Sequence, residues 1–216
     1  MPVPAPSPDA RAVVTGASQN IGEALAAELA ARGHHLIITA RRAEVLAEVA
    51  QRITDKYGVT VEVRACDLTD PADRDKLCTE LAERNISILC ANAGTATFGA
   101  VAELPAEGEK AQVQLNVQGV HDLVLAVLPG MIARKGGGIL ISGSAAGNSP
   151  IPNNATYAAS KAFANTFSES LRGELKPHGI NVTLLAPGPV RTELPDPAEQ
   201  SLVERLIPDF LWIDTE

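Results

Sequence analysis

The stretch YAASK places a tyrosine, Tyr157, four residues before a lysine, Lys161. On a helix these two positions share one face, with Cβ atoms about 6 Å apart. A free phenol has a pKa of about 10 and is a poor acid–base catalyst at neutral pH, but a neighbouring ammonium group favours its ionised form. The spacing therefore predicts that Tyr157 transfers a proton with the help of Lys161. A chance pairing is the alternative.

A second candidate is the stretch TGASQNIG, residues 15–22, which follows an apolar run and precedes a helical pattern. The free N–H groups and the positive end of a helix at such a turn can bind a phosphate. Gly16 permits a tight turn, and Gly22 lets the helix pack closely on the sheet. Asn20 stands where a glycine is expected, and asparagine tolerates left-handed backbone angles best among the other residues. An ordinary strand-to-helix turn is the alternative.

The end of the next apolar run predicts which nucleotide such a turn would bind. Ala40 is followed by Arg41 and Arg42, and the first acidic residue is Glu44. A carboxylate at this place would bind the ribose 2′-hydroxyl of NAD, whereas a guanidinium group pairs with the 2′-phosphate of NADP. The sequence therefore favours NADP(H) over NAD(H). For Arg42, a solvated position at the start of a helix is an equally good interpretation.

These residues depend on an alternation of apolar runs and helical patterns along the chain. Strands are expected at 12–16, 34–40, 59–65, 86–91, 137–143 and 180–186. Helices are expected at 20–32, 44–57, 71–84, 106–135 and 155–176. This alternation predicts an α/β fold with parallel strands, and the continuous apolar runs predict a sheet covered on both faces. We therefore expect a doubly wound parallel sheet of Rossmann type, in three α/β/α layers, with at least six strands.

Most of the unusual residues follow directly after a predicted strand. In a doubly wound sheet, ligands bind outside the carboxyl ends of the strands. The residues at those ends are Gly16, Arg41, Arg42, Asp67, Asn92, Ala93, Gly94, Ser142, Gly143, Ser144, Pro187, Gly188 and Pro189. Turns in general need Gly, Pro, Asn and Asp, but that need does not explain the serines and arginines.

Size and composition limit the function classes. The 216 residues fit one domain, which we expect over 11–216 after a flexible, proline-rich tail at 1–10. The net charge of −8 argues against a nucleic-acid surface. Cys66, Cys78 and Cys90 form no CxxC pair, so we expect neither a disulfide framework nor a metal site, and read them as reduced cytoplasmic thiols. The amino terminus does not resemble a signal peptide, and no stretch is expected to cross a membrane.

The ordered set TGASQNIG, ANAG, Asn116, ISGSAAG, YAASK and PGPVRT resembles the classical short-chain dehydrogenase/reductase family over residues 11–194. Ser144 lies 13 residues before Tyr157, as the catalytic serine of that family does. Asn116 lies in the middle of the long predicted helix, where the family has its catalytic asparagine. On the residues alone, Ser142 competes with Ser144, and Asn116 is interpreted as a structural residue, since asparagine in a helix is usually solvated or of capping type.

The resemblance implies hydride transfer between a nicotinamide and a carbonyl or alcohol carbon, catalysed by Asn116, Ser144, Tyr157 and Lys161. Tyr157 would give or take the proton, Lys161 would favour ionised Tyr157 and hold the nicotinamide ribose, Ser144 would bind the substrate oxygen, and Asn116 would keep a water in a proton relay. The cofactor-binding residues are then expected to be Gly16, Ser18, Gln19, Asn20, Ile21, Gly22, Arg41, Arg42, Asp67, Leu68, Asn92, Ala93, Gly94, Tyr157, Lys161, Pro187, Gly188, Val190 and Thr192.

The sequence also departs from the family pattern. Asn20 replaces a family glycine, Ala91 replaces the first asparagine of the usual NNAG, and Gln19 stands where many NADP-preferring members have a basic residue. After a lid-like segment at 193–216 the sequence stops without the family's final helix and seventh strand, so we expect either a truncated form or a part of a longer chain. These departures keep a second hypothesis open, a catalytically idle protein of the same fold that binds the nucleotide.

The resemblance further implies a homodimer or homotetramer and a small carbonyl or alcohol substrate. Apolar residues in the predicted loops favour an apolar substrate, although core packing explains them equally well. They are Phe98, Ile151, Leu194, Phe210 and Leu211.

Overall fold

The computed structural model describes residues 3–188 of the chain. Its strands are β1 (Arg11–Thr15), β2 (Leu36–Ala40), β3 (Val61–Ala65), β4 (Ile86–Ala91), β5 (Gly137–Ser142) and β6 (Ile180–Leu185). Its α-helices are α1 (Asn20–Ala31), α2 (Ala43–Tyr57), α3 (Pro71–Ala82), α4 (Ala106–Val113), α5 (Val120–Arg134) and α6 (Ala155–Leu175). A π-helical segment, η1 (Gln114–Gly119), joins α4 to α5, and two 3₁₀ turns, η2 (Ala145–Asn148) and η3 (Lys176–His178), flank α6.

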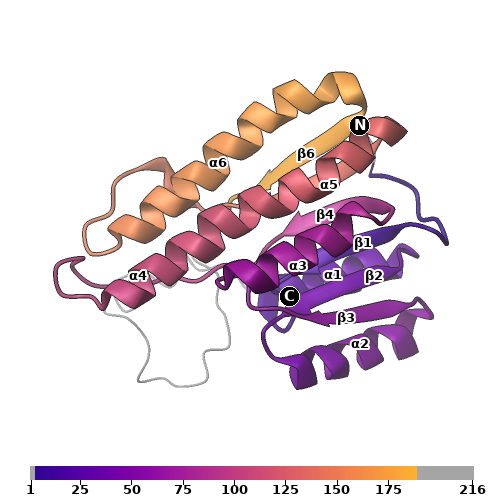
Figure 1. Ribbon diagram of the computed structural model, residues 1–216, viewed down its shortest axis with the longest axis horizontal. Coiled ribbons are helices and arrows are strands. Elements are labelled where there is room, and N and C mark those ends of the chain that lie inside the picture. Colours follow the sequence, from indigo (N-terminus) through magenta and orange to yellow (C-terminus); the bar gives the residue numbers. More distant parts are fainter. Residues whose placement is uncertain (1–2, 189–216) are drawn as a thin grey trace.

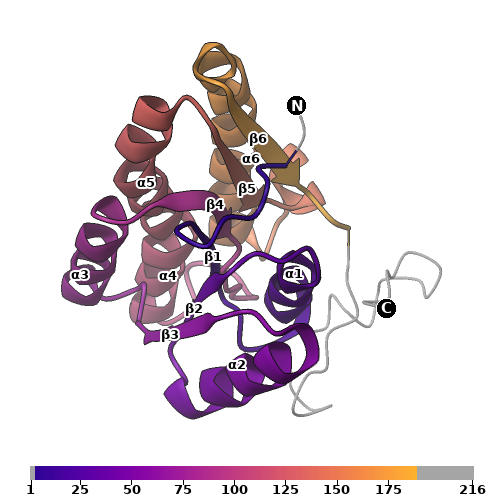
Figure 2. The ribbon, with the colours of Figure 1, turned by 90° about the vertical axis from the view of Figure 1, so that its right-hand side faces the viewer.

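The six strands form one parallel sheet in the order β3-β2-β1-β4-β5-β6. Helices α1 and α2 lie on one face of the sheet, and α3, α5 and α6 lie on the other (Figures 1 and 2). The predicted doubly wound, three-layer fold is therefore confirmed. The strand order reverses between β1 and β4, and a ligand crevice is expected at this switch point. The prediction that the final helix and the seventh strand are missing concerns residues after 188, which lie outside the described part of the chain.

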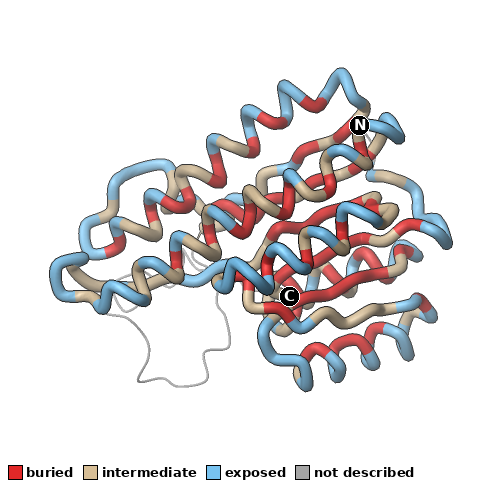
Figure 3. Tube along the Cα trace, viewed as in Figure 1, coloured by how far each residue is buried: buried red, intermediate tan, exposed pale blue. Residues whose placement is uncertain are grey.

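The central strands are buried along most of their length because helices cover both faces of the sheet (Figure 3). Val13, Ile37 and Leu89 belong to the core on the α3–α5–α6 side. Their neighbours Val14 and Leu36 belong to the core beneath α1 and α2. Successive strand residues point to opposite faces, so both kinds of position are apolar, and the strands read as continuous apolar runs.

The long helix predicted at 106–135 differs from the expectation in two ways. It is interrupted by the π-helical segment η1, which contains Asn116. The run Ala106–Arg134 is also long and apolar enough to cross a membrane by length and composition, contrary to the expectation that no stretch would be. In the structure its apolar face packs into the core on the α3 side of the sheet, through Val120, Leu123, Val124, Val127 and Met131.

The described part of the amino-terminal tail lies against the body of the protein. Pro4 is in close contact with β5, because a Cβ added to Gly138 would come within 3.3 Å of the Pro4 Cδ atom. Pro6 lies similarly close to Gly33, at the end of α1. The flexibility expected of residues 1–10 stays a prediction.

Candidate active site

The turn between β1 and α1 has the backbone that the glycine pattern predicts. Asn20 adopts a left-handed conformation with φ of 52°, and Gly16 has φ of 68°. A Cβ at Gly22 would lie 2.1 Å from the Gly16 carbonyl oxygen, so a side chain at 22 would collide with the turn. The prediction that Asn20 can keep the shape of a glycine loop is confirmed.

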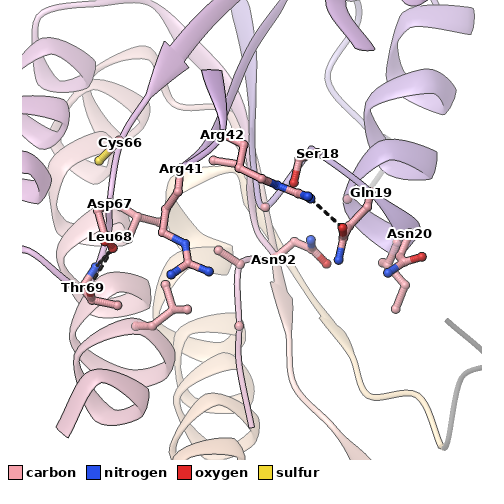
Figure 4. Close-up of a pocket in the computed structure, with 17 residues that line it drawn as sticks. Ser18, Gln19, Asn20, Arg41, Arg42, Cys66, Asp67, Leu68, Thr69 and Asn92 are labelled. Atoms are coloured by element: carbon pink, nitrogen blue, oxygen red, sulfur yellow. Dashed lines mark hydrogen bonds between the residues drawn. The ribbon is translucent and has the colours of Figure 1, made fainter. Parts of the chain in front are cut away.

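A pocket of about 530 Å³ opens at the carboxyl edge of the sheet, over the switch point (Figure 4). The predicted cofactor residues between Gly16 and Gly94 all line it. Four further residues line it that the sequence did not single out, namely Ala40, Cys66, Thr69 and Leu115. Ala40 ends β2, Cys66 and Thr69 follow β3, and Leu115 lies in η1, so only their positions relative to these elements could have indicated them.

The two arginines after β2 extend into this pocket (Figure 4). Arg42 donates a hydrogen bond of 2.7 Å to the side-chain oxygen of Gln19, which joins the glycine turn to the start of α2. Gln19 stands where many NADP-preferring members of the family have a basic residue, and the structure places the guanidinium group of Arg42 beside it. Arg41 carries no side-chain hydrogen bond among the described residues, and its charge acts on Asp67.

Asp67 lies at the far end of the pocket from the glycine turn. Its carboxylate accepts hydrogen bonds from the Thr69 N–H and hydroxyl, at 2.9 and 2.7 Å. Burial raises the pKa of Asp67, but these hydrogen bonds and the charge of Arg41 outweigh burial and hold the pKa below its usual range. The neighbouring Cys66 is buried, which raises its pKa to about 11, so this thiol stays neutral.

Asn92 connects the carboxyl ends of three strands. Its side-chain amide donates to the Thr15 carbonyl at 3.1 Å, and its side-chain oxygen accepts from the Ser142 hydroxyl at 2.9 Å. The Thr15 hydroxyl in turn accepts from the N–H groups of Asn92 and Ala93. These bonds fix the base of the pocket, and they occupy the hydroxyl of Ser142, which is 8 % exposed.

Ser144 has a different environment from Ser142. It begins the short turn η2, where its hydroxyl oxygen accepts a hydrogen bond from the Ala146 N–H at 3.1 Å. No described residue accepts the Ser144 hydroxyl proton, so that proton can be donated to a ligand. Of the two serines, Ser144 is therefore the one whose hydroxyl proton is not taken up by a described residue.

Tyr157 and Lys161 lie one turn apart near the start of α6. The Lys161 ammonium group donates to the Ser142 carbonyl at 2.8 Å and lies 5.8 Å from the centre of the Tyr157 ring. Lys161 is buried, and burial lowers its pKa to about 8, which still leaves it charged at neutral pH. The predicted pair therefore shares one face of one helix.

Asn116 is buried and its side chain is hydrogen-bonded, so it is not one of the solvated asparagines that are usual in helices. Its amide donates to the Thr95 carbonyl at 2.8 Å and to the Ser160 hydroxyl at 3.0 Å, and its oxygen accepts from the Thr95 N–H at 3.0 Å. A π-helical turn is a frequent device at functional sites, and here it brings Asn116 against the segment that follows β4.

Gly94 links the pocket to this second group of residues. It lines the pocket, and a Cβ added to it would lie 3.4 Å from both the Asn116 side-chain oxygen and the Lys161 nitrogen. Pro187 and Gly188 follow β6, and the Pro187 carbonyl accepts from the Ala145 N–H next to Ser144. Val190 and Thr192 lie outside the described residues.

Sequence reasoning also missed Asn165, a polar residue of this region. Asn165 is 8 % exposed, follows Lys161 by one helical turn and is hydrogen-bonded to the Ser144 backbone. The periodic spacing of Tyr157, Lys161 and Asn165, each four residues apart, was the available signal.

Comparisons with known proteins agree with this geometry. The family model described as short chain dehydrogenase matches residues 10–202. An uncharacterized oxidoreductase of Staphylococcus saprophyticus is 34 % identical over 202 residues, covering 93 % of this chain and 86 % of that protein. A very-long-chain 3-oxoacyl-CoA reductase of Anas platyrhynchos is 38 % identical over 195 residues, but the chain spans only 62 % of that protein's length.

The solved structure of a short-chain dehydrogenase from Sphingobium yanoikuyae, in complex with NADPH, superimposes with a TM-score of 0.88. It is 35 % identical, and the superposition covers 95 % of this chain and 79 % of that one. The family model, the relatives and the fold agree over most of the chain, which belongs to the short chain dehydrogenase family of oxidoreductases.

Proposed function

We propose that this protein transfers a hydride between NADP(H) and a carbonyl or alcohol carbon, with Tyr157 giving or taking the proton. The observation that carries the proposal is the position of Gly94, which lines the pocket and where an added Cβ would lie 3.4 Å from both the Asn116 side-chain oxygen and the Lys161 nitrogen. A cofactor in that pocket and the proton-transfer group on α6 would therefore be neighbours.

The pocket residues fit a dinucleotide. A volume of about 530 Å³ lies within the range of cofactor sites, and the turn at Gly16 and Gly22 has no room for a Cβ, so its backbone can approach a diphosphate closely. Asp67 and Leu68 would hold the adenine, and Asn92, Ala93 and Gly94 its ribose. When bound, the nicotinamide supplies or accepts the hydride.

The arginines support NADP(H) as the preferred cofactor. Arg41 and Arg42 reach the same pocket, and Arg42 is held next to the glycine turn by Gln19. A charge-assisted hydrogen bond to a 2′-phosphate contributes about 1.5–3 kcal/mol, which corresponds to a preference of roughly tenfold to a hundredfold. No acidic residue among those lining the pocket stands at the end of β2 to bind a free 2′-hydroxyl instead.

The residues on α6 and η2 divide the proton chemistry between them. The Ser144 hydroxyl has its oxygen occupied by the Ala146 N–H, so it acts as a donor to the substrate oxygen. Tyr157 donates the proton that the reduced oxygen takes up, and the buried ammonium of Lys161 lies 5.8 Å from the centre of the Tyr157 ring, beside this proton donor. Asn116 fixes the segment after β4, and its role in a water relay stays a prediction.

The alternative is a protein of this fold that binds the nucleotide without turnover. All four predicted catalytic residues lie in one region of the structure, which supports the enzyme. Calorimetric titration with NADPH, followed by a carbonyl-reduction assay, tests both hypotheses. We expect Tyr157→Phe to bind NADPH as the wild type does and to lose turnover; persistent turnover would remove Tyr157 from the mechanism.

The first substrates to test are 3-oxoacyl thioesters. The relative from Anas platyrhynchos is named for such a substrate. Two of the apolar residues expected in the substrate loops are accessible, since Phe98 is exposed and Ile151 is half-buried. We further propose that the substrate is apolar, that the protein forms a homodimer or homotetramer, and that its location is cytoplasmic.

A further inference from the structure

Among the described residues, every hydrogen bond between α6 and the loop that carries Ser144 comes from a single side chain. The loop runs from Gly143 to Asn148, between β5 and α6, and includes η2. The Asn165 amide donates to the Ser144 carbonyl at 2.9 Å and to the Asn148 side-chain oxygen at 3.0 Å. Its own side-chain oxygen accepts from the Ser144 N–H at 3.3 Å. One buried side-chain amide therefore binds both the N–H and the carbonyl group of Ser144.

Two glycines let the loop come this close to the helix. A Cβ at Gly143 would lie 2.1 Å from the Asn165 side-chain oxygen, and a Cβ at Gly147 would lie 2.5 Å from the Lys161 backbone. The loop thus contacts α6 where Lys161 and Asn165 lie, with no space between them for a side chain.

Asn165 also lies on the same helix as Tyr157 and Lys161, the proposed catalytic pair. Tyr157, Lys161 and Asn165 are each four residues apart on α6, so they lie along one face of one rigid helix. The first two supply the proton chemistry in the proposed function. The third determines where the Ser144 hydroxyl lies relative to them.

From these contacts we infer that Asn165 is a positioning residue, which holds the Ser144 hydroxyl at its working distance from Tyr157. This inference rests on the proposed function. Asn165 is 8 % exposed and reaches the reaction only through the Ser144 loop. Misplacement of a reacting group by about 1 Å can cost on the order of a hundredfold in rate, so the loss of this clamp should be visible in kcat.

Asn165→Leu is the most informative substitution, because leucine has a similar size but forms none of the three hydrogen bonds. We expect kcat for carbonyl reduction to fall roughly tenfold to a hundredfold, with the affinity for NADPH unchanged. Asn165→Ala, which leaves space in place of an apolar side chain, gives a second variant should the leucine variant not fold. Ser168→Ala is the matched control, because Ser168 is buried on the same helix and bonds only within it.

A double-mutant cycle separates positioning from a general structural role. If Asn165 acts through Ser144, the double variant Ser144→Ala/Asn165→Leu will be no slower than Ser144→Ala alone. Losses that multiply in the double variant would overturn the inference.

Hydrogen exchange gives a test that does not depend on turnover. In Asn165→Leu, amides 144–148 should exchange faster than in the wild type, while those of β5 should not change. If the wild type reduces no carbonyl that is tested, the proposed function fails, whereas the exchange result still decides whether the clamp exists. Unchanged exchange in the loop would contradict it.

Discussion

The substitution Gly22→Ala should damage both the fold and nucleotide binding, and the structure indicates by how much. The added Cβ would lie 2.1 Å from the Gly16 oxygen, 2.7 Å from the Gly16 carbonyl carbon and 2.8 Å from the Asn92 amide nitrogen. Two of these three atoms belong to the backbone of the glycine turn. A side-chain rotation therefore cannot relieve the overlap, and α1 or the turn has to move by about 1 Å.

Overpacking of a rigid site costs about 1–3 kcal/mol, and we expect the upper end here because backbone must shift. A loss of about 3 kcal/mol in the free energy of unfolding lowers Tm by roughly 6–12 °C in a domain of this size. The shift also moves the N–H groups at the start of α1 away from a bound phosphate, so NADPH affinity should fall at least about tenfold.

Urea denaturation followed by circular dichroism measures the first effect, and calorimetric titration with NADPH measures the second. Gly173→Ala is the control, since a Cβ at this α6 position meets nothing within 4 Å and alanine favours a helix by about 1 kcal/mol. A Gly22→Ala protein with wild-type stability and wild-type NADPH affinity would refute the close approach of α1 to the turn.

Three further predictions follow from the site and its surroundings. Arg41→Ala should weaken NADPH binding roughly tenfold or more and leave NADH binding nearly unchanged, as measured by calorimetry; equal weakening of both would remove the 2′-phosphate assignment. Asn20→Gly should raise the unfolding free energy by about 0.5–1 kcal/mol, because φ of 52° suits glycine better than asparagine; a loss of stability in urea would show that the Asn20 side chain contributes contacts. Burial, and then the charge of Arg32, lower the pKa of His34 from 6.5 in the fold, so the unfolded chain binds a proton first and stability should decrease as pH falls below about 6.5; in urea titrations from pH 8 to 5, His34→Asn should flatten this dependence, and an unchanged slope would assign it to other groups.

The order and type of the elements were predictable because each obeys a local rule. Pro71 stands in the first turn of α3, and the side chain of Asp70 caps that helix by accepting from the Asp73 N–H, so its start can be read from the sequence. The parallel strands read as apolar runs because both sheet faces are covered. The spacing of Ile21, Leu25 and Leu29, four residues apart, would place all three on the buried face of α1. Only Leu29 of them is fully buried, together with Gly22, Ala26 and Ala30, so this pattern was less accurate.

The site was predictable where a residue type has one special property. Left-handed φ at Asn20 and the spacing of Tyr157 from Lys161 are of this kind. The bond between Arg42 and Gln19 joins residues 23 apart, and the clamp from Asn165 to Ser144 joins residues 21 apart. Both pairings join segments that only the folded sheet and helices bring together, so the periodic spacing on α6 marks Asn165 as a candidate but does not show that it contacts Ser144.

The π-helical segment η1 has a consequence for which changes in chain length this fold can accept. Removing one residue between 114 and 119 would allow α4 and α5 to join in an unbroken α-helix. The extra residue is held in the wide turn itself, so closing that turn would leave α4 and α5 in nearly the same orientation and would remove only the local displacement of the backbone. Asn116 lies in this wide turn, where it reaches Thr95 and Ser160, whereas the apolar face from Val120 to Met131 lies beyond it. Single-residue deletions at this point should therefore cost the contacts of Asn116 while they spare the core.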